Sequence, residues 1–164
     1  MTGNPSPADL VHLDRAFALA RAARDAGDRP FGAVIVGPTG TVIAEAGSHQ
    51  GSGGGPTAHA EMNALRAAMA AADRGTLARS TLYASTEPCV MCSAAAFYAG
   101  ISRIVFGLRE ARLRPIRNQT GRGAGIALSC RDVLARGSRP VSVIGPVQED
   151  QAAALHTGYW GQPT

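Results

Sequence analysis

The chain has 164 residues, of which 45% are hydrophobic and 17% are charged, so one compact domain with a full apolar core is expected. A formal net charge of +4, with arginine as every basic residue, permits contact with a polyanion without indicating one. Three cysteines exclude a disulfide framework, the first residues lack a signal-peptide pattern, and no apolar run approaches the ~20 residues of a membrane span. We therefore expect a cytoplasmic protein, in which cysteines serve more often as metal ligands or catalysts than as disulfides.

The first third of the chain predicts a helix followed by a hairpin. Residues 1–7 are rich in proline and are expected to be disordered, whereas apolar residues recur at helical spacing over residues 8–26. Residues 30–37 form a nearly continuous apolar run that predicts a buried strand, and residues 41–48 are expected to pair back onto it as an antiparallel strand. The glycine-rich residues 49–57 predict a flexible loop.

The rest of the chain alternates between helices and strands. In chain order the predictions are a helix at 58–75, a strand at 80–86, a helix at 88–100, a strand at 101–107, a short helix at 130–137, a strand at 139–147 and a terminal helix at 149–160. Residues 108–125 are rich in Arg and Gly and show no clear period. A hairpin followed by such alternation predicts a three-layer α/β/α sandwich, with a single domain over residues 8–164 and one central mixed sheet of about five strands.

Two short motifs each open a predicted helix: "HAE" at residues 59–61 and "PCVMC" at residues 88–92. A C-x-x-C alone could be a disulfide switch, part of a zinc site or chance. Together with His59, however, Cys89 and Cys92 make three ligands of the kinds that zinc prefers, and a fourth position left for water is typical of catalytic zinc. Glu61 is poorly placed to share the metal with His59 but can lie beside that water, where a carboxylate can pass a proton to a leaving group.

In these motifs the sequence resembles the cytidine deaminase-like superfamily, in the branch of guanine deaminases, fungal cytosine deaminases and tRNA adenosine deaminases. The matching segments are "PFGAVIV", "PTAHAEMNAL" and "LYASTEPCVMCSAAAFYAGISRIVFG", and their H-x-E…P-C-x-x-C signature is typical of zinc deaminases. The resemblance implies one catalytic Zn²⁺ per chain on His59, Cys89 and Cys92, with Glu61 as the proton shuttle, and a homodimer. "PFGAVIV" is most similar to the guanine deaminase type.

The resemblance also implies a set of substrate contacts. The residues expected at the substrate are Phe31, Ser48, His49, Ala60, Ser85, Glu87, Pro88, Tyr98, Tyr159 and Trp160. Many relatives carry an Asn, whose amide contacts the substrate, where this chain has Ser48. A serine hydroxyl lacks the fixed donor–acceptor pair of an amide, so this departure makes an unusual aminated ring a candidate substrate.

The leading hypothesis is hydrolytic deamination of a free nucleobase or related amino-heterocycle, with guanine first, and release of ammonia. A nucleoside deaminase and a tRNA adenosine deaminase are alternatives. RNA needs a phosphate-binding surface, which arginines at 109, 112, 114, 117 and 122 could offer, but the tail after Asp150 has no basic residue. A non-catalytic zinc module would leave Glu61 without a role, and a redox dithiol protein would leave both His59 and Glu61 without one.

Overall fold

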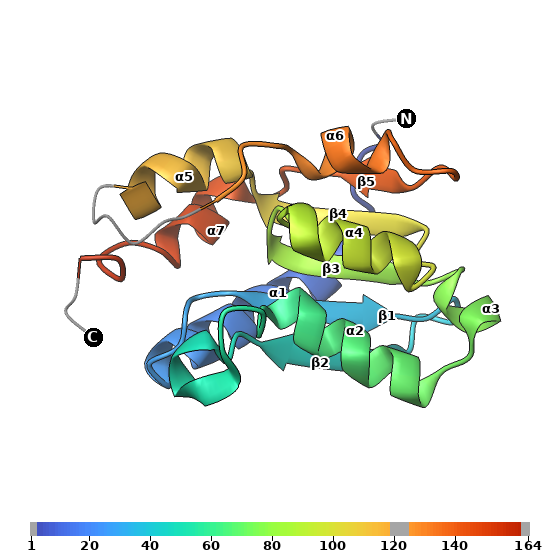
Figure 1. Ribbon diagram of the computed structural model, residues 1–164, viewed down its shortest axis with the longest axis horizontal. Coiled ribbons are helices and arrows are strands. Elements are labelled where there is room, and N and C mark those ends of the chain that lie inside the picture. The colour runs from blue at the N-terminus through green and yellow to red at the C-terminus, as the bar shows by residue number, and fades with distance from the viewer. Residues whose placement is uncertain (1–2, 119–124, 162–164) are drawn as a thin grey trace.

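The computed structural model describes residues 3–118 and 125–161. Within these residues, five strands form one mixed sheet. The strands are β1 Gly32–Val36, β2 Val42–Gly47, β3 Thr81–Thr86, β4 Arg103–Leu108 and β5 Ser142–Ile144, in the spatial order β2-β1-β3-β4-β5 (Figure 1). β1 pairs antiparallel with β2 and β3, while β3 pairs in parallel with β4, and β4 with β5. The predicted hairpin and mixed sheet are confirmed.

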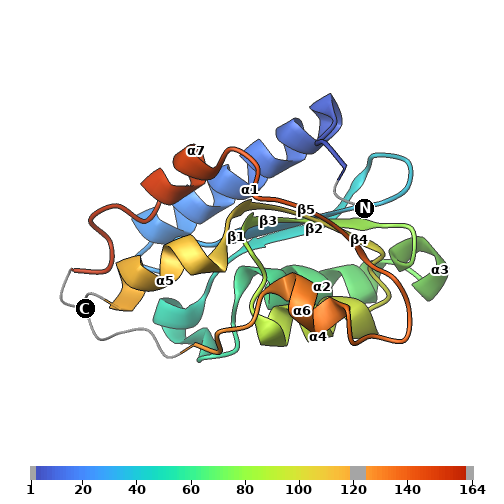
Figure 2. The same ribbon diagram turned by 90° about the horizontal axis from the view of Figure 1, so that it is seen from above.

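Helices cover both faces of the sheet, which confirms the predicted three-layer sandwich. α1 Pro7–Asp25 and α7 Glu149–Ala154 lie on one face, and α2 Ala60–Ala71, α4 Val90–Tyr98 and α6 Cys130–Leu134 lie on the other (Figure 2). Side chains alternate between the faces along each strand, so Val34 of β1 joins the core beneath α1 while Ile35 joins the core beneath α2. None of the described helices is long and apolar enough to cross a membrane.

The helix predicted over residues 58–75 is interrupted. α2 ends at Ala71, and a separate short helix, α3 Arg74–Leu77, follows. The break has a local cause, because the carboxylate of Asp73 accepts a hydrogen bond from the Thr76 N–H (2.8 Å) and so caps a new helix start. The terminal helix is also shorter than predicted, since α7 ends at residue 154 and turns continue to residue 161.

A further helix, α5 Glu110–Asn118, lies in the stretch that shows no apolar period. Leu113 is its only buried apolar side chain among those described, so the sequence carries no hydrophobic repeat there. Ion pairs of Glu110 with Arg114 and Arg117, four and seven residues along the same helix, stabilise it in addition.

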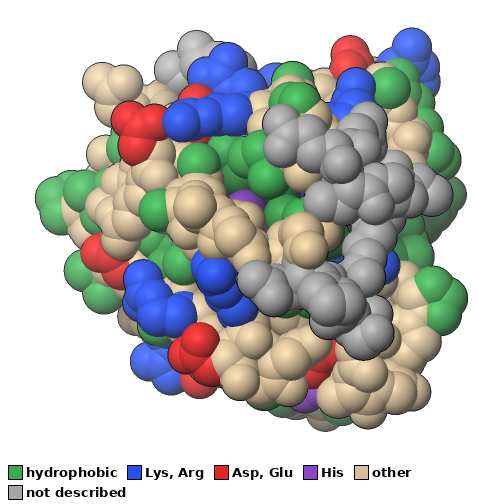
Figure 3. All heavy atoms as spheres, turned by 90° about the vertical axis from the view of Figure 1, so that its left-hand side faces the viewer, with side chains coloured by type: hydrophobic (Ala, Val, Ile, Leu, Met, Phe, Trp, Pro, Cys, Tyr) green, Lys and Arg blue, Asp and Glu red, His purple; other side chains and the backbone are tan. Residues whose placement is uncertain are grey.

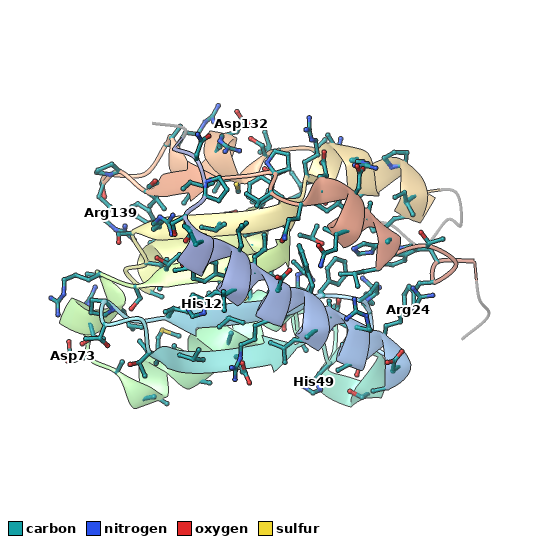
Figure 4. All side chains as sticks on the ribbon, turned by 180° about the vertical axis from the view of Figure 1, so that it is seen from behind. His12, Arg24, His49, Asp73, Asp132 and Arg139 are labelled. Carbon is teal, nitrogen blue, oxygen red and sulfur yellow. The ribbon has the colours of Figure 1, made fainter. Side chains whose placement is uncertain are left out.

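The starts of α2 and α4 lie at the end of the sheet where α5 and the C-terminal residues also lie (Figure 1). Arg24 of α1 holds the C-terminal segment there, because its guanidinium donates to the carbonyl oxygens of Leu155 and Thr157, both at 2.8 Å (Figure 4). The loop after β2 begins with a π-helical turn, η1 Gln50–Gly54, whose N–H groups at residues 51 and 52 donate to the buried carboxylate of Asp28. Loops from distant parts of the sequence therefore meet at this end.

A buried carboxylate joins α1 to the sheet. Asp9 is 2% exposed and accepts hydrogen bonds from the Tyr83 hydroxyl (2.8 Å), from both terminal nitrogens of Arg103 (2.7 Å each) and from the Ser6 N–H (2.8 Å). Burial alone would raise the pKa of Asp9, but the Arg103 guanidinium and the donors of Ser6 and Tyr83 hold it well below its usual range.

We predict that Asp9→Ala lowers the free energy of unfolding by about 3 kcal/mol, because it leaves Arg103 and Tyr83 without their buried acceptor. Since the folded-state pKa of Asp9 is depressed, this stability is present above the unfolded-state pKa of about 3.9 and is lost as the pH falls below it. Urea unfolding from pH 7 to pH 3 measures both effects, with the exposed Asp25→Ala as the control. An Asp9→Ala protein as stable as the wild type at pH 7 would contradict this prediction.

Candidate active site

The three predicted metal ligands converge at the starts of α2 and α4. His59 is the N-cap residue of α2, Cys89 is the N-cap residue of α4, and Cys92 lies in the first turn of α4. The Nδ1 atom of His59 lies 3.7 Å from the Sγ atom of Cys89 and 3.5 Å from that of Cys92, and all three ligand atoms lie within 4.8 Å of one another. Zinc bonds of about 2.1 Å to nitrogen and 2.3 Å to sulfur in a tetrahedron require N···S separations of about 3.6 Å. These residues therefore fit a zinc ion.

Of the two thiols, only that of Cys89 ionises readily by itself. Hydrogen bonds from the Cys92 thiol and from His59 lower the pKa of Cys89 to about 4, and the N-terminus of α4 favours the same thiolate. The hydrogen bond to Cys89, together with burial, raises the pKa of Cys92 well above its ordinary value, while the Cys89 thiolate raises that of His59. Two adjacent thiolates repel each other, so both can ionise only beside a cation, and His59, Cys89 and Cys92 would hold zinc here.

Glu61 lies in the first turn of α2, two residues beyond His59, and is 6% exposed. Burial, together with the negative charge of Cys89, raises the pKa of Glu61 to about 7. A carboxyl group of this kind can both accept and donate a proton near neutral pH. The structure thus brings Glu61 beside the three ligands without making it one of them.

Two polar side chains that the sequence analysis missed hold the ligand-bearing segments. Asn63 donates through Nδ2 to the carbonyl oxygens of Gly47 (3.1 Å) and Ala58 (3.3 Å), and so ties the residue before His59 to the end of β2. The Ser93 hydroxyl donates to the carbonyl oxygen of Pro88 (3.0 Å), the residue before Cys89. Each lies four residues after a ligand that caps a helix, and this spacing is a signal that the sequence does contain.

A narrow cleft of about 30 Å³ opens beside this site. Among the predicted site residues it is lined by Phe31, His59, Glu61, Glu87 and Cys89. It is also lined by six residues that the sequence analysis did not assign to the substrate: Arg29, Gln50, Thr86, Glu110, Leu113 and Arg117. Four of these residues lie outside the motifs of the sequence, so only the fold could reveal them: Arg29, Glu110, Leu113 and Arg117.

The other predicted substrate residues lie outside the lining of this cleft. Ser48, Ala60, Ser85 and Pro88 are buried, and the Ser85 hydroxyl accepts a hydrogen bond from the Gly32 N–H (3.0 Å). Ser48 contacts Gln50 instead, since its hydroxyl accepts from the Gln50 N–H (3.4 Å). His49 is exposed on the loop after β2 (Figure 4), and Tyr98 is 79% exposed on α4.

Trp160 packs behind the cleft rather than lining it. Its indole is 4% exposed, stacks on His156 and lies 6.1 Å from the ring of Phe31, while Tyr159 contacts it edge-on. Burial lowers the pKa of His156 to about 3, so this imidazole is neutral. Its Nδ1 atom accepts from the Trp160 indole N–H (3.3 Å), which leaves its Nε2–H to donate to the Thr86 hydroxyl (3.4 Å). The tail is thereby joined to a residue of the cleft.

Glu87 serves as an anchor for two helix starts. One carboxylate oxygen accepts from the Glu110 N–H (2.9 Å) at the start of α5, and the other accepts from the Cys130 N–H (3.0 Å) at the start of α6. Both oxygens are thus used by backbone donors. Glu87 therefore positions Glu110 and the rest of α5 over the cleft.

We predict that Glu87→Ala lowers the free energy of unfolding by about 2–5 kcal/mol, because it leaves two buried N–H groups unsatisfied. Glu87→Gln keeps one carbonyl acceptor and should lose less. Urea unfolding measures the loss, and limited proteolysis within residues 109–130 should be faster in the Ala variant. Equal stability of the wild type and the Ala variant would rule out this anchoring role.

Comparison with known proteins places this site in a family. Residues 7–108 match the family model described as the cytidine and deoxycytidylate deaminase zinc-binding region. The chain is 39% identical over 155 residues to a probable cytosine deaminase of Schizosaccharomyces pombe, covering 94% of each chain. It is 40% identical over 95 residues to a tRNA-specific adenosine deaminase of Haemophilus influenzae, covering 58% of this chain and 55% of that one.

A solved structure of guanine deaminase from Nitrosomonas europaea has a TM-score of 0.78 to this fold at 25% identity, covering 97% of this chain and 87% of that one. The family match spans more than half of the chain and includes all three ligands and Glu61. The chain therefore belongs to the cytidine and deoxycytidylate deaminase family and is a zinc-dependent deaminase, a hydrolase of C–N bonds with a His/Cys/Cys zinc site.

Proposed function

We propose that this chain deaminates a free nucleobase or a closely related amino-heterocycle, with guanine as the first candidate and cytosine as the second. The observation that carries the proposal is the small size of the cleft, about 30 Å³, beside the metal ligands and Glu61. That space corresponds to roughly two water molecules, so side chains at its rim must move even for a flat ring. A planar base needs the smallest movement, and a nucleoside needs space for a ribose as well.

Pairing within the arginine-rich stretch supports a small substrate rather than RNA. Four of its arginines pair with carboxylates of α5 and α7, namely Arg109 with Glu149 (2.8 Å), Arg112 with Asp150 (2.7 Å), Arg114 with Glu110 (3.8 Å) and Arg117 with Glu110. Arg122 lies outside the described residues. Figure 3 shows arginine side chains beside acidic ones on this end of the molecule. Charges compensated in this way attract a phosphate backbone weakly.

The extent of similarity to relatives also supports a small substrate rather than RNA. The probable cytosine deaminase matches across 94% of the chain, whereas the tRNA-specific adenosine deaminase matches across 58%. At 155 of 164 residues, the longer match includes α5, which contributes Glu110, Leu113 and Arg117 to the cleft. The guanine deaminase structure likewise covers 97% of the chain.

In the proposed reaction, Glu61 moves the protons. His59, Cys89 and Cys92 would hold zinc, which would supply a nucleophile near neutral pH by lowering the pKa of water. Glu61 accepts a proton from that water, whose oxygen forms a bond to the ring carbon that carries the amino group. Glu61 then donates the proton to the amino group, so that the C–N bond breaks and ammonia leaves. Its burial beside the ligands suits both steps, because burial contributes to raising the pKa of Glu61 to about 7.

We predict that the zinc-loaded protein releases ammonia from guanine or cytosine faster than from their nucleosides, adenosine or a tRNA anticodon stem-loop. Glu61→Gln should lower kcat by at least about 10²-fold, because it removes the proton shuttle, while the zinc content stays at that of the wild type. An ammonia assay and elemental analysis measure the two effects. The exposed Glu45→Gln serves as the control, since Glu45 pairs with Arg15 on the surface away from the cleft.

Turnover of the RNA alone would replace the proposal with tRNA editing, and turnover of nucleosides alone would replace it with nucleoside deamination. Full activity of Glu61→Gln would contradict the role of Glu61. The homodimer and the choice of guanine over cytosine are part of the same proposal, and sedimentation equilibrium tests the dimer.

A further inference from the structure

Arg29 brings a positive charge to the cleft. Its side chain lines the cleft together with His59, Glu61 and Cys89, and it is half-buried. Within residues 3–118 and 125–161, no carboxylate forms an ion pair with it. Its guanidinium lies 5.9 Å from the centroid of the Trp160 ring, which packs behind Phe31.

The carboxylates of the cleft are engaged elsewhere. Glu110 pairs with Arg117, and both oxygens of Glu87 accept from backbone N–H groups. Glu61 lies beside the metal ligands, where the proposed reaction uses it. Arg117, the other arginine of the cleft, therefore has a carboxylate partner on its own helix, whereas no ion pair among the described residues includes Arg29.

A half-buried guanidinium favours an acceptor from whatever fills the cleft. Arg presents five N–H donors and no acceptor, so it matches an oxygen and cannot accept from an amino group. Because a planar base requires the smallest movement of the cleft's rim, we assign this oxygen to the base rather than to a sugar or a phosphate. We propose that Arg29 is a specificity-determining residue that donates to an exocyclic oxygen of the substrate ring, and so selects amino-oxo rings over diamino rings; this inference rests on the proposed function.

The selection works through a mismatch as well as an attraction. An amino group in place of the oxygen would set donor against donor and leave the guanidinium buried without an acceptor. Guanine and cytosine each carry one amino group and one exocyclic oxygen, whereas 2,6-diaminopurine and 2,4-diaminopyrimidine carry an amino group in place of that oxygen. Each pair differs at the group that Arg29 is proposed to contact and at the adjacent ring nitrogen, which carries a hydrogen beside the oxygen and none beside the amino group.

The test compares kcat/KM for both pairs in the wild type, in Arg29→Met and in Arg29→Lys, with products identified by chromatography. A charge-assisted hydrogen bond is expected to be worth about 10- to 150-fold. Arg29→Met should lose that factor on guanine or cytosine and change little on the diamino partner, and Arg29→Lys should lose less. Arg66→Met, at an exposed position of α2, is the matched control. Equal losses on both members of a pair would overturn the inference.

Binding provides a readout that does not depend on turnover. Trp160 is the only tryptophan of the chain and lies beside Arg29, so quenching of its fluorescence reports a ring in the cleft. Hypoxanthine, which has a ring oxygen and no amino group, should bind the wild type more tightly than purine does, and Arg29→Met should remove that difference. Equal binding of hypoxanthine and purine by the wild type would overturn the inference, whether or not any base is deaminated. If the wild type binds hypoxanthine more tightly than purine, Arg29→Met removes that difference, and no base is deaminated, the result contradicts the proposed function and leaves the inference about Arg29 intact.

Discussion

The close approach of two helix N-termini is the constraint on which the rest of the structure depends. α2 and α4 begin side by side at one end of the sheet, and this brings a nitrogen and two sulfur atoms within 4.8 Å of one another. The same placement directs the N–H groups at the start of α4 toward the Cys89 thiolate. Asn63 and Ser93 bind the carbonyl groups of the residues just before His59 and Cys89. The backbone that carries these two ligands is thereby fixed at both helix starts.

A second group of residues builds the wall of the cleft around this centre. Glu87, at the end of β3, orients the starts of α5 and α6, and α5 brings Glu110, Leu113 and Arg117 to the cleft. The tail is held from the opposite side by Arg24 and by the contact between His156 and Trp160. The chemistry common to the family thus lies in the two helix starts, while the space offered to a substrate is set by segments far along the chain.

Some charged side chains of the cleft are paired within the fold, and others are free to contact a substrate in the proposed reaction. Arg117 and Glu110 neutralise each other within α5, and Glu87 serves the backbone. Arg29 and Glu61 also line the space beside the ligands, where they are the proposed donor and the proposed proton carrier. A ring with an acceptor and a leaving amino group complements both, and this connects the proposed reaction to the proposed selectivity.

The sequence by itself determined the class of fold and the metal ligands. Strand and helix signals were strong wherever apolar residues recur, as in β1 with its continuous buried run. The ligands stand in short motifs whose spacing can be recognised in the sequence without knowledge of the fold. α5 was missed because a helix with one buried apolar residue among those described has no apolar period. The break after α2 was missed because the Asp73 cap acts through local hydrogen bonds from Thr76, which leave the apolar pattern unchanged. Only the tertiary structure decided that Arg29, Gln50 and Glu110 line the cleft while Ser48 and Tyr98 do not. The physical reason is that a motif depends on neighbours along one helix turn, whereas a cleft depends on loops that packing brings together from across the chain.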